Sequence, residues 1–231
     1  MKSSLILCVL AIVLISGCIT TDIPTGNAEA YELPGLNNTT IFYLNLSSVQ
    51  VVDNVINETT IRFVLEDGGE MSFRNPVAID HSGKNVSFTT SKEPILGKSY
   101  IKFSFESPFS GFVAYTQSDG QDFSRMLTKN GSVRVVLPLN YTTGSRLFGI
   151  AQPEPYNTTV DAKGRDVLIW ENPYPAHQKI EVKYYHESAP YILFYIVIFL
   201  LFCAFVIFGY YYFSLRSLKK KWEMVEKGLK K

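Results

Sequence analysis

Cysteine is nearly absent from this chain of 231 residues: Cys8, Cys18 and Cys203 are its only three, and none lies between positions 19 and 202. The middle of the chain therefore has no disulfide bond and no thiolate metal site. A domain of roughly 150 residues can bury enough apolar surface to fold without such crosslinks. We expect a middle domain that is held together by its hydrophobic core alone.

The common catalytic motifs are also missing. The only histidines are His81, His177 and His186, and the chain contains no His-Glu-x-x-His, Gly-x-Ser-x-Gly or Cys-x-x-Cys pattern. The "GKS" at 97–99 resembles the end of a phosphate loop, but Lys92 stands where that loop needs its first glycine. We predict no catalytic residues, no metal and no cofactor, and hence a protein that is not an enzyme.

Three weaker constellations favour structural interpretations. Asp119 and Asp122 offer only two carboxylates, whereas a calcium ion needs about six to eight oxygen ligands. A solvated turn is therefore expected there. Asp80 and His81 lack a third catalytic partner, which favours a polar loop. Four aromatic residues could form a surface for glycans or a partner. Trp170 alternates with Leu168 in a strand, however, and is expected in the core. The four are Trp170, Tyr174, Tyr184 and Tyr185.

Basic charge is scarce outside the C-terminus. Residues 19–190 hold 14 Lys and Arg against 19 Asp and Glu, a formal charge of −5. Because a clustered basic footprint is missing, we expect no nucleic-acid partner.

The apolar residues gather instead in one run at each end. The first, "LILCVLAIVLI" at 5–15, follows Lys2 and is too short to span a bilayer, so residues 1–17 are predicted to be a secretory signal peptide. The following "ISGC" resembles the lipobox of prokaryotic lipoproteins, which implies that Cys18 is lipidated and becomes the mature N-terminus. An ordinary signal cleaved nearby is the alternative.

The second run predicts a transmembrane helix. Residues 191–213 carry no charge and no proline, and as a helix they reach about 34 Å, enough to cross the hydrocarbon core. Seven basic residues follow in the tail at 214–231, which places that tail in the cytoplasm. The tail is predicted to be an amphipathic helix that continues the span or lies on the inner leaflet. Its expected membrane-interface residues are Trp222, Arg216, Lys219, Lys220 and Lys221.

Asparagine is concentrated in Asn-x-Ser/Thr sequons, which hold eight of the chain's 12 asparagines. This excess predicts N-glycosylation outside the cell, although a shared preference of Asn and Thr for turns explains part of it. The candidates are Asn37, Asn38, Asn45, Asn57, Asn85, Asn130, Asn140 and Asn157.

The lipobox, the dense sequons and the C-terminal span together point to an archaeal protein. The pattern of residues 168–202 is a Trp-containing strand, an Asn-Pro turn, a strand ending "VKYY" and then the span. In this order the chain resembles a family of uncharacterised archaeal surface proteins that are membrane-anchored and begin with a lipobox. The resemblance is firm over about 160–215 and weak over 100–160, and it implies no known activity.

The middle of the chain is predicted to be mainly β. A linker at 18–36 precedes an extracellular β-domain at 37–187, in which short strands recur between turn signals. The alternation of apolar and polar residues in "YIKFSFE" (100–106) is typical of an antiparallel sheet with one buried face. We expect an antiparallel β-sandwich, either one large domain or two small ones divided near 91–99.

Three hypotheses about function follow. The first is a non-catalytic, glycosylated cell-surface protein, bound to membrane lipid, that binds a cell-wall or membrane-protein partner or organises the envelope. The second is an accessory subunit of a membrane complex that acts through its span and tail. The third, an envelope hydrolase, lacks the catalytic constellations that it needs.

Overall fold

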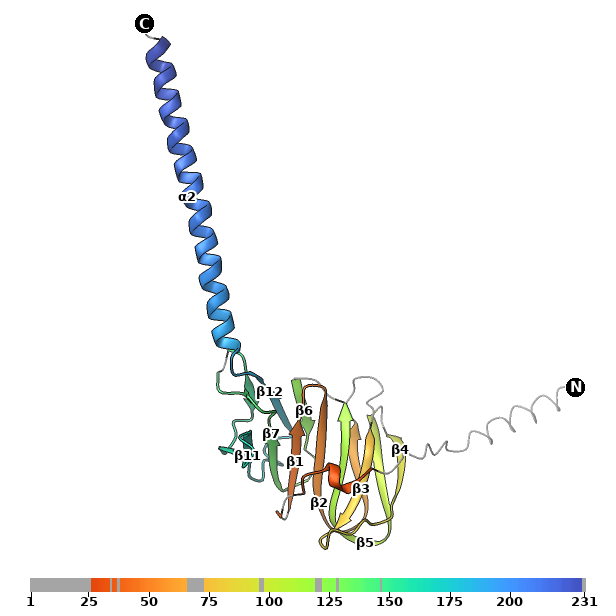
Figure 1. Ribbon diagram of the computed structural model, residues 1–231. Coiled ribbons are helices and arrows are strands. Elements are labelled where there is room, and N and C mark those ends of the chain that lie inside the picture. The colour runs from red at the N-terminus through yellow and green to blue at the C-terminus, as the bar shows by residue number, and fades with distance from the viewer. Residues whose placement is uncertain are drawn as a thin grey trace, which may run out of the picture. The chain divides into compact units, whose positions relative to one another are not determined.

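The computed structural model describes residues 26–229 except 34, 37, 66–72, 96–97, 119–121, 128 and 146. The chain forms two compact units, a β-domain that ends at Tyr185 and a helical unit that begins at His186 (Figure 1). A short 3-10 helix, η1, spans Ala28–Ala30. The strands are β1 (Thr39–Leu44), β2 (Ser48–Leu65), β3 (Arg74–Asp80), β4 (Thr89–Ile95), β5 (Lys98–Ser118), β6 (Asp122–Met126), β7 (Ser132–Val136), β8 (Tyr141–Thr142), β9 (Ile150–Gln152), β10 (Asn157–Val160), β11 (Asp166–Trp170), β12 (Lys179–Lys183) and β13 (Tyr185–His186).

The main sheet has eight strands, seven of which follow the order β10-β11-β7-β1-β2-β5-β3. β1 and β7 run parallel, with Thr39 opposite Ser132, whereas the other neighbours run antiparallel. The eighth strand, β4, pairs with the N-terminal half of β5, and β3 pairs with the C-terminal half. The predicted mainly-β fold with antiparallel sheets is therefore confirmed.

The long strands β2 and β5 bend back over their own sheet. A straight strand would separate Phe103 from Tyr115 by about 40 Å, yet their ring centroids lie 6.4 Å apart. The register of the β2–β5 pair shifts on both sides of Glu58, next to Asn57, whose φ of 55° is left-handed. Such bulges bend the strands that carry them. The far halves of β2 and β5, with β4, thereby become part of the second layer of the sandwich.

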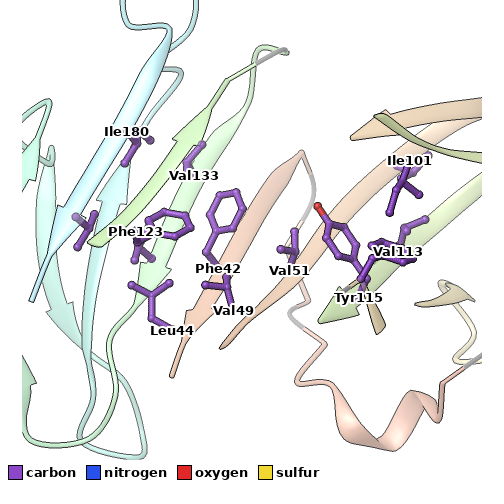
Figure 2. Packing of buried hydrophobic residues seen from close by; sticks show 14 of the residues in the cluster. Phe42, Leu44, Val49, Val51, Ile101, Val113, Tyr115, Phe123, Val133 and Ile180 are labelled. Carbon is purple, nitrogen blue, oxygen red and sulfur yellow. The ribbon is translucent and has the colours of Figure 1, made fainter. Parts of the chain in front are cut away.

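A small sheet in the order β6-β12-β9 completes this second layer. Phe123 on β6 packs against Phe42 on β1 with ring centroids 5.1 Å apart. Figure 2 shows Phe123 and Ile180 from the small sheet turned toward Val133 and Phe42 of the main sheet. These side chains belong to one hydrophobic cluster that runs between the layers, as the period-two alternation predicts.

The N-terminal segment packs onto the β-domain. Tyr31 is 6 % exposed, lies in a cluster with Val52 and Ile79, and donates its hydroxyl hydrogen to the backbone oxygen of Asn75 at 2.7 Å. The backbone N–H of Gly26 donates to the backbone oxygen of Pro76. The part of the expected linker at 18–36 that the structure describes is therefore largely attached to the domain, because its aromatic residue has a place in the core.

Some strand boundaries differ from the sequence expectation. The expected strands "YIKFSFE" (100–106) and "GFVAYT" (111–116) are one strand, β5, because the chain bends between them without reversing. Residues 48–58 extend the expected strand "TTIRFVLE" (59–66) into β2. A division was left open near 91–99, and the described residues of this stretch lie on β4 and β5, which pair with each other. By contrast, "DVLIW" (166–170) matches β11.

The second unit contains one long helix, α2 (Ala189–Leu229). From Ala189 to Val225 it is long and apolar enough to cross a membrane, with a mean hydropathy of 3.0 in its most apolar part. At 1.5 Å per residue its 41 residues reach about 62 Å, roughly twice the hydrocarbon thickness. The expected span and tail thus form one continuous helix.

Candidate functional site

The sequon asparagines lie at the surface of the β-domain. All seven that the structure describes are exposed, as are Asn27, Asn75 and Asn172 outside the sequons, whereas Asn54 is 4 % exposed. Three of the seven have a left-handed φ, which asparagine tolerates well, so the preference for turns explains their placement too. The seven are Asn38, Asn45, Asn57, Asn85, Asn130, Asn140 and Asn157. Asn37 and Cys18 lie outside the described residues.

The expected membrane-interface residues all lie on α2, after its apolar stretch. Trp222 is 76 % exposed, and the basic residues of the group are exposed as well. Their role at a membrane interface stays a prediction. The group is Arg216, Lys219, Lys220, Lys221 and Trp222.

The weaker constellations are structural. The Oδ1 of Asp80 accepts hydrogen bonds from Ser82 and Lys84, which fold a turn around it, while His81 packs against Phe112. Asp122 pairs with Lys183 across two strands, and Asp119 lies outside the described residues. Within the part of the chain that the structure describes, no group of three or more His, Cys, Asp or Glu residues could hold a metal ion.

Two of the four residues in the aromatic group lie in the core, and the other two are half-buried. Trp170 is 3 % exposed and its indole Nε1–H donates to the backbone oxygen of Pro153 at 2.8 Å. Tyr184 is also buried and its hydroxyl donates to the backbone oxygen of Asn45 at 2.9 Å. The expectation that Trp170 lies in the core is confirmed, so these two rings form no ligand surface.

A polar cluster inside the sandwich is the feature that sequence reasoning missed. Asp53 lies two residues after Val51 on β2 and therefore points to the same inner face. Its side chain is 2 % exposed, and one carboxylate oxygen accepts from the Lys129 ammonium at 2.7 Å. The other oxygen accepts from the Thr40 hydroxyl at 2.5 Å. Lys129 is half exposed, so the pair links the interior to the surface.

Arg125 enters the same interior from β6. It is 7 % exposed, its Nη2 donates to the side-chain oxygen of Gln117 at 2.5 Å, and its Nη1 lies 3.4 Å from the backbone oxygen of Val64. Its guanidinium also lies over the ring of Phe42. Among the described residues its Nε has no hydrogen-bond partner and its guanidinium pairs with no carboxylate. A buried guanidinium is costly, so the lack of a counter-ion in this part of the chain calls for a reason.

A cavity of about 90 Å³ joins these groups. Its apolar wall includes Phe42, Ile61 and Phe63, and its polar wall includes Asp53, Arg125, Lys129 and the Tyr115 side chain. A second hollow of about 290 Å³ shares four of the lining residues and lies next to it, toward the bulge of β2; the shared residues are Asn38, Ile61, Arg62 and Lys129. The cavity therefore continues to the surface past Lys129.

The Tyr115 hydroxyl is an uncharged donor at this cavity. Figure 2 shows its oxygen turned away from Val113. Burial raises the pKa of Tyr115 to about 12, although the Arg125 charge opposes the rise. The phenol consequently keeps its proton at every physiological pH and can donate a hydrogen bond.

One sequence signal could have revealed this cluster. In "VVDNVI" (51–56) an aspartate and an asparagine interrupt an otherwise apolar stretch, and buried polar residues need partners. Arg125 gives a weaker signal: it lies two residues after Phe123 in "DFSRM" and so shares its face, but the strand is short and Phe123 alone indicates which face is buried. Its burial becomes evident only when β6 is placed opposite β1.

The comparison with known families gives one match. A family model described as "Family of unknown function (DUF5803)" matches residues 36–230. Since this match covers most of the chain, the protein belongs to that family. No curated protein matches the chain.

Proposed function

We propose that this member of a family of unknown function is a single-pass surface protein that presents its β-domain outside the cell and acts there by binding, not catalysis. The observation that carries the proposal is the surface placement of all seven described sequon asparagines on a domain that is joined to one apolar helix. Glycans need exposed acceptors on the outer side of a membrane. The partner is membrane lipid together with a cell-wall component or another membrane protein, and no cofactor takes part.

The orientation follows from charge. The basic residues after the span favour a cytoplasmic C-terminus, and a cleaved signal peptide at 1–17 favours the same arrangement. A lipid on Cys18 would add a second attachment. The lipobox, in turn, supports an archaeal origin.

Protease treatment of intact cells tests the orientation. Residues 19–190 should be degraded and a tag after Lys231 should be protected, whereas lysed cells should lose both. A tag that is digested in intact cells would contradict the proposal.

A second candidate function is that of an accessory subunit in a membrane complex. It is favoured by a stripe of exposed apolar side chains on α2 beyond the span, namely Leu215, Leu218, Trp222 and Val225. Extraction in mild detergent followed by native electrophoresis tests it. Leu218→Ser together with Val225→Ser should release the protein from a complex, and Met224→Ser, on another side of the helix, should not.

A further inference from the structure

We propose that the cavity between Arg125 and Asp53 is a binding site for a small carboxylate monoanion with an apolar body. This inference deepens the proposed binding role and rests on it, since it names the chemistry of a ligand for the same β-domain.

The charge of the cavity wall sets the charge of the ligand. Asp53 is neutralised by Lys129 at 2.7 Å, and Arg62 at the rim is paired with Glu93 at 3.0 Å. The Arg125 guanidinium then carries the one positive charge of the wall that lacks a carboxylate partner among the described residues. One buried positive charge is balanced by one negative charge, so a monoanion fits better than a dianion.

The free donors set the chemical class. A guanidinium has five N–H groups in a planar fork, which matches the two oxygens of a carboxylate. Arg125 uses two of them on Gln117 and Val64. The protonated Tyr115 hydroxyl adds a neutral donor at the same cavity, and it forms no hydrogen bond with the described residues.

The apolar wall and the volume set the size. A cavity of about 90 Å³ has room for roughly six water-sized groups at about 15 Å³ each. Phe42, Ile61 and Phe63 would face the rest of the ligand, and they offer no hydrogen bonds to a second polar group. Short-chain or single-ring carboxylates meet both conditions.

Calorimetric titration of the full chain in detergent micelles tests the proposal. The probes are sodium acetate, butyrate and benzoate, with sodium phosphate and chloride at matched ionic strength. We expect butyrate or benzoate to bind more tightly than acetate, because they fill the apolar part of the cavity. Phosphate and chloride should bind at least about tenfold more weakly than the best carboxylate, a difference of about 1.4 kcal/mol.

Variants locate the site. Arg125→Gln should weaken binding of the best carboxylate at least about tenfold, since it removes a charged donor. Tyr115→Phe should weaken it severalfold and serves as the second variant if Arg125→Gln does not fold, which circular dichroism would reveal. Arg134→Gln is the matched control, because the Nε of Arg134 is equally buried and unpartnered but lies outside this cavity.

Two results would overturn the proposal. One is the absence of any carboxylate binding up to about 10 mM, where even a millimolar ligand would saturate the site. The other is binding that survives the folded Arg125 and Tyr115 variants, or that phosphate and chloride match. Neither result bears on the orientation in the membrane, so a failure here leaves the protease test of the proposed function intact.

Discussion

At the residue scale, an ion-pair network fastens the N-terminal segment to the β-domain. Glu32 accepts hydrogen bonds from Lys163 at 2.6 Å and from Arg165 at 2.8 Å, and Asp161 holds the other side of Arg165. Burial alone would raise the pKa of Glu32, but these hydrogen bonds outweigh it and lower the pKa below its usual value. Local sequence patterns could not reveal this contact, because Glu32 and Arg165 are 133 positions apart.

The lowered pKa of Glu32 predicts a loss of stability in acid. A depressed carboxyl pKa contributes stability that is fully present above the unfolded value, near 4.3, and that is lost as the pH falls through the folded value. Glu32→Gln should therefore shrink the difference in unfolding midpoint between pH 7 and pH 3, measured by urea titration of the full chain in detergent. Glu154→Gln, at an exposed site, is the control. An undiminished acid effect in Glu32→Gln would contradict the prediction.

At the scale of elements, sequence reasoning predicted well those elements whose local pattern does not change along their length. β11 and the span of α2 keep a single pattern from end to end. β2 and β5 do not, because the bend at Glu58 lets their two halves face each other. A local pattern cannot reveal such a bend, since the contacts that stabilise it come from residues distant in sequence.

The bend depends on an aromatic cluster around Phe103, which is fully buried and contacts Phe63, Phe73, Phe88 and Tyr115. Phe103→Ala should lower the free energy of unfolding by about 3–5 kcal/mol, because it leaves a cavity where the folded-back strands meet. Urea unfolding of the full chain in detergent measures the loss.

Tyr156→Ala is the control for this substitution. Tyr156 is 76 % exposed, so its loss should change the free energy of unfolding by no more than about 0.5 kcal/mol. A cost below about 1 kcal/mol for Phe103→Ala would mean that the cluster does not hold the bend.

At the scale of the whole molecule, the sequence predicted a mainly-β domain followed by one apolar helix, and both are present. It could not predict the order of the strands. The parallel pairing of β1 with β7 places Thr39 opposite Ser132, and the sequence of neither strand indicates which strand it pairs with. For the same reason the sequence could not reveal the cavity, whose walls come from β1, β2, β5, β6 and β7.

The N-terminal attachment is the remaining prediction at this scale. If Cys18 is the lipidated first residue, Cys18→Ser should block cleavage after Gly17 and leave a precursor that migrates more slowly on gels. Mass analysis of the mature N-terminus, with its attached groups, checks the result. Retention in the membrane is no test, because α2 could hold the chain by itself. Identical processing of parent and variant would refute lipidation.

The central position of β1 has a consequence for the time course of folding. Ribosomes deliver the N-terminus first, so β1 and β2 are complete well before β7 exists. Until Ser132 and its neighbours arrive, 93 positions after Thr39, one edge of β1 has no strand to pair with. Unpaired edges invite pairing with other chains. The nascent protein therefore passes through an interval in which its earliest hairpin has an unpaired edge that can pair with other chains, and a chaperone that covers β1 would protect it during that interval.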